Sequence, residues 1–111
     1  MLLVLRKIFS WDSYKMEEIV TDKGILKYRM PNILEAYDLL EASGISNGEV
    51  STLKLKRNII KEMKYLIDFS GIEGVETYDQ LLEDIETMIT PLSIVADEVI
   101  LKSFAVFKKK I

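Results

Sequence analysis

Residues 27–40 have the sequence KYRMPNILEAYDLL, and this stretch changes from the pattern of a strand to that of a helix at one proline. Before Pro31, apolar residues alternate with Lys27 and Arg29, which is the period of a half-buried strand. After Pro31, apolar residues recur at helical spacing, at Ile33, Ala36, Tyr37 and Leu40. Because a proline disfavours the helical conformation in the residue before it, the strand has to end at this point.

The helix after Pro31 carries its own start and stop signals. Asn32 is a residue type that caps helix N-termini, and Glu35, three residues later, can bond back to the cap. Such a capping box stabilises a helix by about 1 kcal/mol. Gly44 is the glycine expected just past the other end. The sequence therefore predicts a helix from Ile33 to about Ser43.

Upstream of the proline, the pattern predicts an antiparallel β-hairpin. Residues 14–20 form its first arm and residues 25–30 its second, with the turn at residues 21–24, TDKG. Gly24 can supply the positive φ that a tight turn needs. A helix from about Glu17 is the local alternative, which Gly24 and the alternation after it disfavour.

Two stretches precede the hairpin. Residues 1–5, MLLVL, are too few for the core of a signal peptide, and basic residues follow them instead of preceding them. We interpret them as a buried strand or an N-terminal plug. Residues 8–14 are rich in aromatic side chains, Trp11 among them, and are predicted to be extended.

Two helices are expected in the middle of the chain. After a loop around Asn47-Gly48, apolar spacing predicts a helix from about Ser51 to Phe69, although residues 52–56 also alternate like a strand. A second capping box, from Thr77 to Gln80, starts the next helix. Its expected buried stripe is Leu81, Leu82, Ile85, Met88 and Ile89.

The last helix is expected to follow a break at Thr90, with Pro91 at its first position, and to continue into the lysines at 108–110. Between Leu92 and Phe107, apolar residues cover most of its circumference. A helix that is apolar nearly all round is either central in its fold or meets a partner. The hypothesis is that a partner-binding or self-association face includes Val99, Phe104 and Phe107.

Together these elements predict an α+β fold, an N-terminal antiparallel β-hairpin followed by a bundle of about four α-helices. The 111 residues suffice for a single domain, divided into a hairpin region at 1–31 and a helical region at 32–111. No apolar run approaches the roughly 20 residues that a membrane-spanning helix needs. The chain is therefore expected to be cytoplasmic, without contact with a membrane.

The composition argues against an enzyme. There is no cysteine and no histidine, so thiolate chemistry and the commonest general base and metal ligand are both missing. No serine stands in a Gly-x-Ser-x-Gly turn. Three carboxylates at helical spacing, Asp79, Glu83 and Glu86, could form a weak site for a hard cation, but a solvated acidic face is the better interpretation. No cofactor or metal is predicted.

The net charge of -3 conceals an uneven distribution. Residues 53–64 contain Lys54, Lys56, Arg57, Lys61 and Lys64, whereas residues 65–101 contain no Lys or Arg and many carboxylates. Either helices of opposite charge pack together, or the two segments are docking faces for identical copies in a homo-oligomer. Overall acidity and the lack of a helix-turn-helix pattern make nucleic acid an unfavoured partner.

The hairpin, the run KYRMP at 27–31 and the helix after it resemble the start of the small tail assembly chaperones of long-tailed bacteriophages and prophages. In that family, a short strand that ends in an Arg and a Pro commonly leads into a helical remainder. The resemblance covers residues 1–45. Asn32 stands where Thr or Ser is frequent, and all three residue types cap helices.

The resemblance implies a non-enzymatic protein that binds the tape-measure protein, keeps it soluble and recruits tail-tube subunits in the cytoplasm of a bacterial host. Members of the family often have a second, longer form made by ribosomal frameshifting, and the lysines at 108–110 are compatible with a slippery coding run. The alternative is a small regulatory binding module. It would be a toxin-immunity protein acting through the acidic segment 73–86, or a nucleic-acid-associated adaptor acting through the basic helix.

Overall fold

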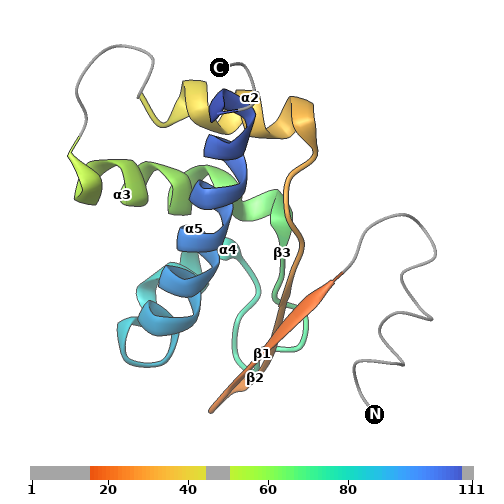
Figure 1. Cartoon of the computed structure of the whole chain (residues 1–111). Helices are drawn as coiled ribbons and strands as arrows, with labels where there is room; N and C mark the ends of the chain where they lie inside the picture. Colours follow the sequence, from red (N-terminus) through yellow and green to blue (C-terminus); the bar gives the residue numbers. More distant parts are fainter. Residues whose placement is uncertain (1–15, 45–50, 109–111) are drawn as a thin grey trace.

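The predicted hairpin is present in the computed structural model, which describes residues 16–44 and 51–108, and it gains a third strand (Figure 1). Strand β1, Glu17–Thr21, pairs antiparallel with β2, Gly24–Tyr28. Strand β3, Ile67–Asp68, pairs antiparallel with the other edge of β2, which gives the order β1-β2-β3. The predicted segments at 1–5 and 8–14, and the loop around Asn47-Gly48, lie outside the described residues.

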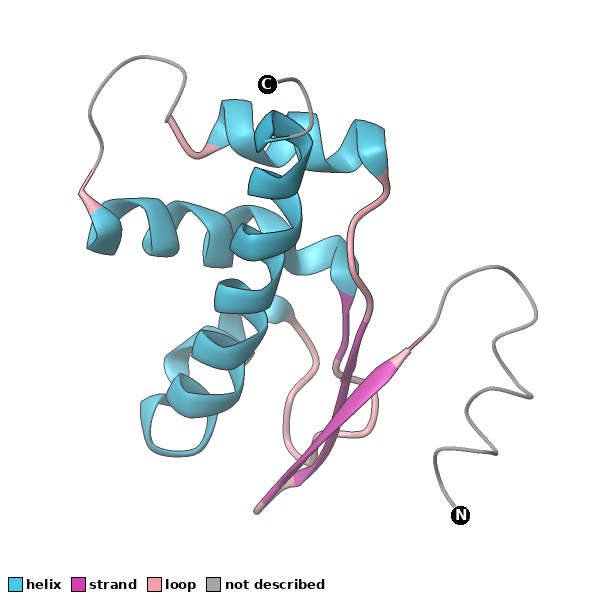
Figure 2. Cartoon of the chain, viewed as in Figure 1, coloured by secondary structure: helices cyan, strands magenta, loops and turns pink. Residues whose placement is uncertain are grey.

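Helices make up most of the described chain, as Figure 2 shows. In order along the chain they are α2 Ile33–Ala42, α3 Thr52–Glu62, the 3-10 helix η2 Met63–Leu66, α4 Tyr78–Glu83 and α5 Ile85–Lys108. The predicted fold class, a β-hairpin followed by about four helices, is confirmed. The region from residue 32 onward is not purely helical, however, because it supplies β3.

Helix α5 is the centre of the arrangement. It packs across α2 and α3 and also contacts α4 and β1 (Figure 1). The described elements share one hydrophobic core, to which each layer contributes fully buried side chains such as Leu26, Leu39, Ile59, Leu81 and Val95. Within residues 16–44 and 51–108, no helix has both the length and the hydropathy needed to cross a bilayer.

The junction at Pro31 forms as the sequence predicts. The Asn32 side chain accepts a hydrogen bond from the Glu35 N–H at 2.9 Å, and a Glu35 carboxylate oxygen accepts one from the Asn32 N–H at 2.9 Å. The Arg29 guanidinium donates to both carboxylate oxygens of Glu35, at 2.8 and 2.9 Å, and lies 5.9 Å from the centre of the Tyr65 ring. Strand, cap and helix are thus held by one carboxylate.

Helix α2 differs from expectation in its orientation. Its buried side chains are Ala36, Leu39 and Leu40, whereas Ile33 and Tyr37 of the expected apolar stripe are exposed. The helix ends where predicted, because Gly44 has a φ of +86° and terminates it as a C-terminal glycine.

The carboxylate of Glu35 makes the junction sensitive to acid. Hydrogen bonds from Arg29, and then from the Asn32 N–H, hold the pKa of Glu35 below its usual 4.5. The unfolded chain therefore binds this proton at a higher pH than the folded chain does. The stabilisation is complete above about pH 4.5 and is lost as the pH falls through the lower folded pKa. We expect Glu35→Gln to lower the melting temperature at neutral pH and to flatten its fall toward acid.

Thermal unfolding followed by circular dichroism from pH 7 to about pH 3 measures this effect. Glu41→Gln is a matched control, because it removes an exposed carboxylate of the same helix outside the junction. The difference between the two profiles isolates the contribution of Glu35. Parallel profiles for the two variants would contradict the assignment.

The predicted second helix is too long. It ends at Glu62, and η2 and β3 occupy the residues up to Asp68. Ile67 is extended, with φ −109° and ψ 129°, and the Leu66 carbonyl accepts a hydrogen bond from the Arg29 N–H at 3.0 Å. Pairing with β2 therefore overrides the apolar spacing. At the other end the start is settled, because the Ser51 side chain caps the helix by accepting from the Lys54 N–H.

The predicted break at Thr90 is also wrong, since α5 continues through Pro91 and the chain breaks at Asp84 instead. The Asp84 carboxylate accepts from the Thr87 N–H at 3.3 Å, and its carbonyl accepts from the Met88 N–H at 2.9 Å. Asp84 thus caps α5. Pro91 lacks the N–H that would bond to the Thr87 carbonyl, but the buried face that continues on both sides of it maintains the helix.

The tip of the hairpin docks on the loop between β3 and α4. Gly24 has a φ of +131°, forms a bridge with Ile72, and lies so close to this loop that an added Cβ would stand 2.0 Å from the carbonyl oxygen of Gly71. Next to it, the Lys23 carbonyl accepts from the Glu73 N–H at 2.8 Å, and the Lys23 ammonium contacts the Asp84 carboxylate at 2.7 Å. The tip is therefore tied both to the loop and to the cap of α5.

Candidate protein-binding groove

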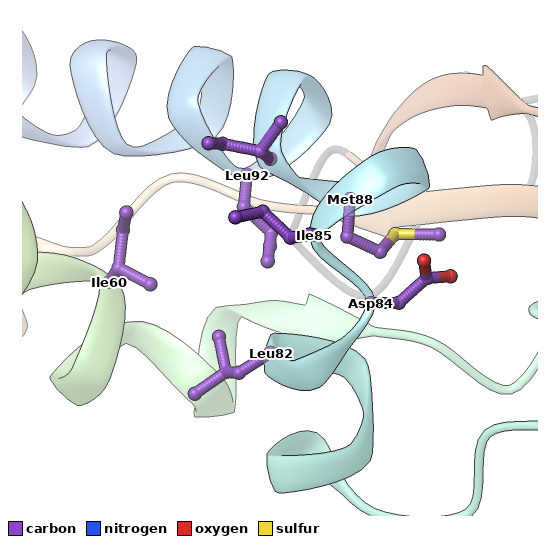
Figure 3. Close-up of a pocket in the computed structure, with 7 residues that line it drawn as sticks. Ile60, Leu82, Asp84, Ile85, Met88 and Leu92 are labelled. Carbon is purple, nitrogen blue, oxygen red and sulfur yellow. The ribbon is translucent and has the colours of Figure 1, made fainter.

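The break between α4 and α5 opens an apolar groove. It has a volume of about 230 Å³ and is lined by Ile60 of α3, Leu82 of α4, Asp84, and Ile85, Met88, Ile89 and Leu92 of α5. Figure 3 shows Ile60, Leu82 and Leu92 around Ile85, with the Asp84 carboxylate turned away from them. A hollow with this lining offers dispersion contacts and desolvation, and no group arranged for chemistry.

Three of the lining side chains were expected in the core and are exposed. Leu82, Ile85 and Ile89 have exposed fractions of 38%, 64% and 57%. The predicted buried stripe holds only for Leu81 and Met88, which are buried. The reason is the break at Asp84, because two helices of different direction do not continue one stripe. The sequence does contain a signal for this break, because Asp84 is a residue type that caps helix N-termini and acidic residues lie close to it on both sides.

A buried tyrosine joins two of the helices that contribute to the groove. The Tyr78 hydroxyl donates to the Ile60 carbonyl at 2.6 Å and so ties α4 to α3. Burial raises the pKa of Tyr78 above its usual value. The hydroxyl therefore stays protonated and keeps donating throughout the physiological range.

The two walls of the groove carry opposite charge. On α3 and η2 the exposed basic residues are Lys54, Arg57, Lys61 and Lys64, of which Arg57 lies one helical turn before the lining residue Ile60. On the α4 and α5 side, exposed acidic residues follow the wall, namely Asp79, Glu83 and Glu86. Lys56 differs from its basic neighbours because it pairs with Asp97 of α5 at 3.1 Å. The charge of Lys56 is thus paired with a carboxylate of the helix packed against α3, whereas the other basic residues of this segment face solvent.

The residues that the sequence proposed for a partner face have different positions. Val99 has an exposed fraction of 0% and belongs to the core, and Phe104 is half-buried against that core. The side chain of Phe107 lies outside the described residues. Val99 therefore cannot touch a partner while the fold is intact. The exposed apolar side chains of α5 that line the groove, Ile85 and Ile89, belong to its N-terminal end.

The carboxylates considered as a cation site are divided between two helices. Asp79 and Glu83 belong to α4, and Glu86 belongs to α5 beyond the break. In the part of the chain that the structure describes, no three His, Cys, Asp or Glu side chains are grouped so that they could hold a metal ion. The break at Asp84 separates Glu86 from the helical spacing that suggested the site.

Comparison of the chain with protein-family models, with curated protein sequences and with solved structures finds no match. Function therefore has to be inferred from the groove and from the charges along its walls.

Proposed function

We propose that the protein is a non-enzymatic chaperone that holds an apolar helix of a protein partner in the groove between α3, α4 and α5. In its specific form, the proposal is a phage or prophage tail assembly chaperone that binds the tape-measure protein and recruits tail-tube subunits. The observation that carries it is the groove itself, where Leu82, Ile85 and Ile89 expose apolar surface around a hollow. Contiguous exposed apolar surface is typical of protein-binding sites.

The groove offers a useful amount of binding free energy. Burying the exposed parts of Ile85 and Ile89 would contribute about 1–2 kcal/mol each. A helix docked in a groove buries such anchors along one face, at spacings of three, four and seven residues. A chaperone of a long helical protein needs contacts of this modest strength, because it has to be released when the tail assembles. The junction at Pro31, which carries the family resemblance, further supports the specific form.

Co-expression with the tape-measure protein encoded in the same genome tests the proposal. The wild-type chain is expected to shift the tape-measure protein from the pellet to the supernatant. The double variant Ile85→Asp with Ile89→Asp is expected to lose this effect, because two charges in the groove exclude an apolar helix. The soluble fraction after centrifugation is the measurement.

Leu101→Asp is the matched control. Leu101 has an exposed fraction of 72% on the same helix, outside the groove, so this variant should keep the tape-measure protein soluble. Circular dichroism checks that each variant is folded. Equal loss with the control, or full activity of the groove variant, would contradict the proposal.

One observation favours the alternative of a toxin-immunity protein. The carboxylates of the segment 73–86 that were expected to face a toxin are exposed, at Glu73, Glu76, Asp79, Glu83 and Glu86. An immunity protein would form a tight one-to-one complex that survives the groove substitutions and weakens when Glu73 and Glu76 are changed to Lys. The groove variant and this acidic variant therefore separate the two functions.

A further inference from the structure

We infer that the partner helix is amphipathic with two unlike flanks, one acidic and one basic, and that these flanks set its direction in the groove. This inference rests on the proposed function and adds the chemistry of the partner. It follows from the positions of charges relative to the side chains that line the groove.

The basic wall is built around Ile60. Arg57 lies three residues before it on α3 and so stands beside it, and Lys64 follows in η2, directly after the end of α3. Both are exposed and neither forms an ion pair with another described residue, although the Arg57 guanidinium donates a hydrogen bond to the Asn58 side chain at 3.1 Å. A helix lying in the groove would place one of its flanks against these two cations.

The acidic wall has the same construction. Asp79 lies three residues before Leu82, and Glu86 lies three residues before Ile89, which puts each carboxylate beside an apolar lining residue. Asp79 and Glu86 are exposed. Lys23 is a cation on this side: its ammonium is held by Asp84 at 2.7 Å and also attracts the Glu86 carboxylate. The opposite flank of the partner would therefore meet negative charge.

Charge complementarity then excludes several kinds of partner. A helix with two acidic flanks would meet repulsion at Asp79 and Glu86, and one with two basic flanks would meet it at Arg57 and Lys64. Nucleic acid would meet the same repulsion along the acidic wall. Reversing a helix end to end exchanges its flanks. A helix with unlike flanks can thus satisfy both walls in only one direction.

Binding of three synthetic helical peptides to the full chain tests the inference. All three have the same apolar stripe, and their flanks are acidic and basic, both acidic, or both basic. Fluorescence anisotropy at low salt should show the peptide with unlike flanks binding about five- to tenfold more tightly than either of the others. The difference should shrink in about 0.5 M salt, which screens the exposed rim charges.

Reversing the charge of the basic wall is a more stringent test than comparing the peptides alone. In the double variant Arg57→Glu with Lys64→Glu, both walls are acidic, so the preference should change to the peptide with two basic flanks. The matched control is Lys54→Glu with Lys102→Glu, which changes the net charge equally at exposed positions that do not flank a lining residue. This control should keep the preference of the wild-type chain.

The outcomes separate this inference from the proposed function. If Ile85→Asp with Ile89→Asp abolishes binding while all three peptides bind the wild-type chain equally, the groove binds helices and the inference about their flanks is overturned. If no peptide binds, both are overturned. If light scattering shows a dimer that the same groove substitutions dissociate, the occupant is a second copy of the chain, and the inference is likewise overturned.

Discussion

Gly24→Ala is expected to destabilise the protein by about 3–5 kcal/mol, from a clash added to backbone strain. The new Cβ would stand 2.0 Å from the carbonyl oxygen of Gly71, a backbone atom that cannot rotate away. Neither segment can shift freely, because Gly24 bridges to Ile72 and the Glu73 N–H donates to the Lys23 carbonyl. The φ of +131° adds strain for any residue with a Cβ. Urea unfolding followed by circular dichroism measures the loss.

Two glycines in the facing loop between β3 and α4 distinguish the clash from the backbone strain. Gly74 has a φ of +80° with nothing within 4 Å of an added Cβ, so Gly74→Ala reports backbone strain alone and should cost about 1 kcal/mol. A Cβ at Gly71 would lie 2.9 Å from the Ile25 carbonyl oxygen, and its backbone is not in the left-handed region, so Gly71→Ala reports a milder clash. A loss at Gly24 no larger than that at Gly74 would show that the hairpin tip is not packed against the loop.

Leu81→Ala is expected to cost about 2–5 kcal/mol, because it leaves a cavity beneath α4. Leu81 has an exposed fraction of 0%. Helix α4 has six residues, which is too short to be stable without tertiary contacts. Its buried residues are Tyr78 and Leu81, so the truncation removes one of its two anchors. Urea denaturation of the full chain gives the change in the free energy of unfolding.

The next residue provides the comparison. Leu82→Ala removes the same atoms from a half-exposed side chain and should cost less than about 1 kcal/mol of stability. Because Leu82 lines the groove, this variant should instead weaken binding of the partner helix. The two neighbours thus separate stability from function. Similar stability losses for both would mean that the groove is closed in solution.

The parts of the fold that could be predicted from the sequence are those fixed by local chemistry. The Asn32 capping box, the Thr77 capping box, the turn at Gly24 and the stop at Gly44 all form as predicted. Each depends on residues a few positions apart, whose side chains bond the nearest backbone groups. Tertiary contacts have little influence on such interactions.

The parts that could not be predicted depend on contacts across the chain. Ile67 continues an apolar pattern that suits a helix equally well, and only the free edge of β2 makes it a strand. Pro91 was expected to begin a helix, but the packing of α5 extends the helix through it.

The candidate site was missed for the same reason. Whether Ile85 is buried depends on how α4 turns away at Asp84, and the apolar spacing holds no information on that turn. Val99 was placed on a surface because α5 is apolar nearly all round. A central helix and a partner-facing helix have the same composition, and only the fold distinguishes them.

The proline inside α5 removes one backbone hydrogen bond from the helix beside the groove. Since Pro91 cannot donate to the Thr87 carbonyl, residues 85–90 are joined to the remainder of the helix by one hydrogen bond fewer than a regular helix would have. These residues carry the exposed Ile85 and Ile89, and also Met88, which is buried in the same core as Val95 beyond the proline. This wall of the groove is therefore held to the rest of α5 by the packing of Met88 as much as by backbone hydrogen bonds.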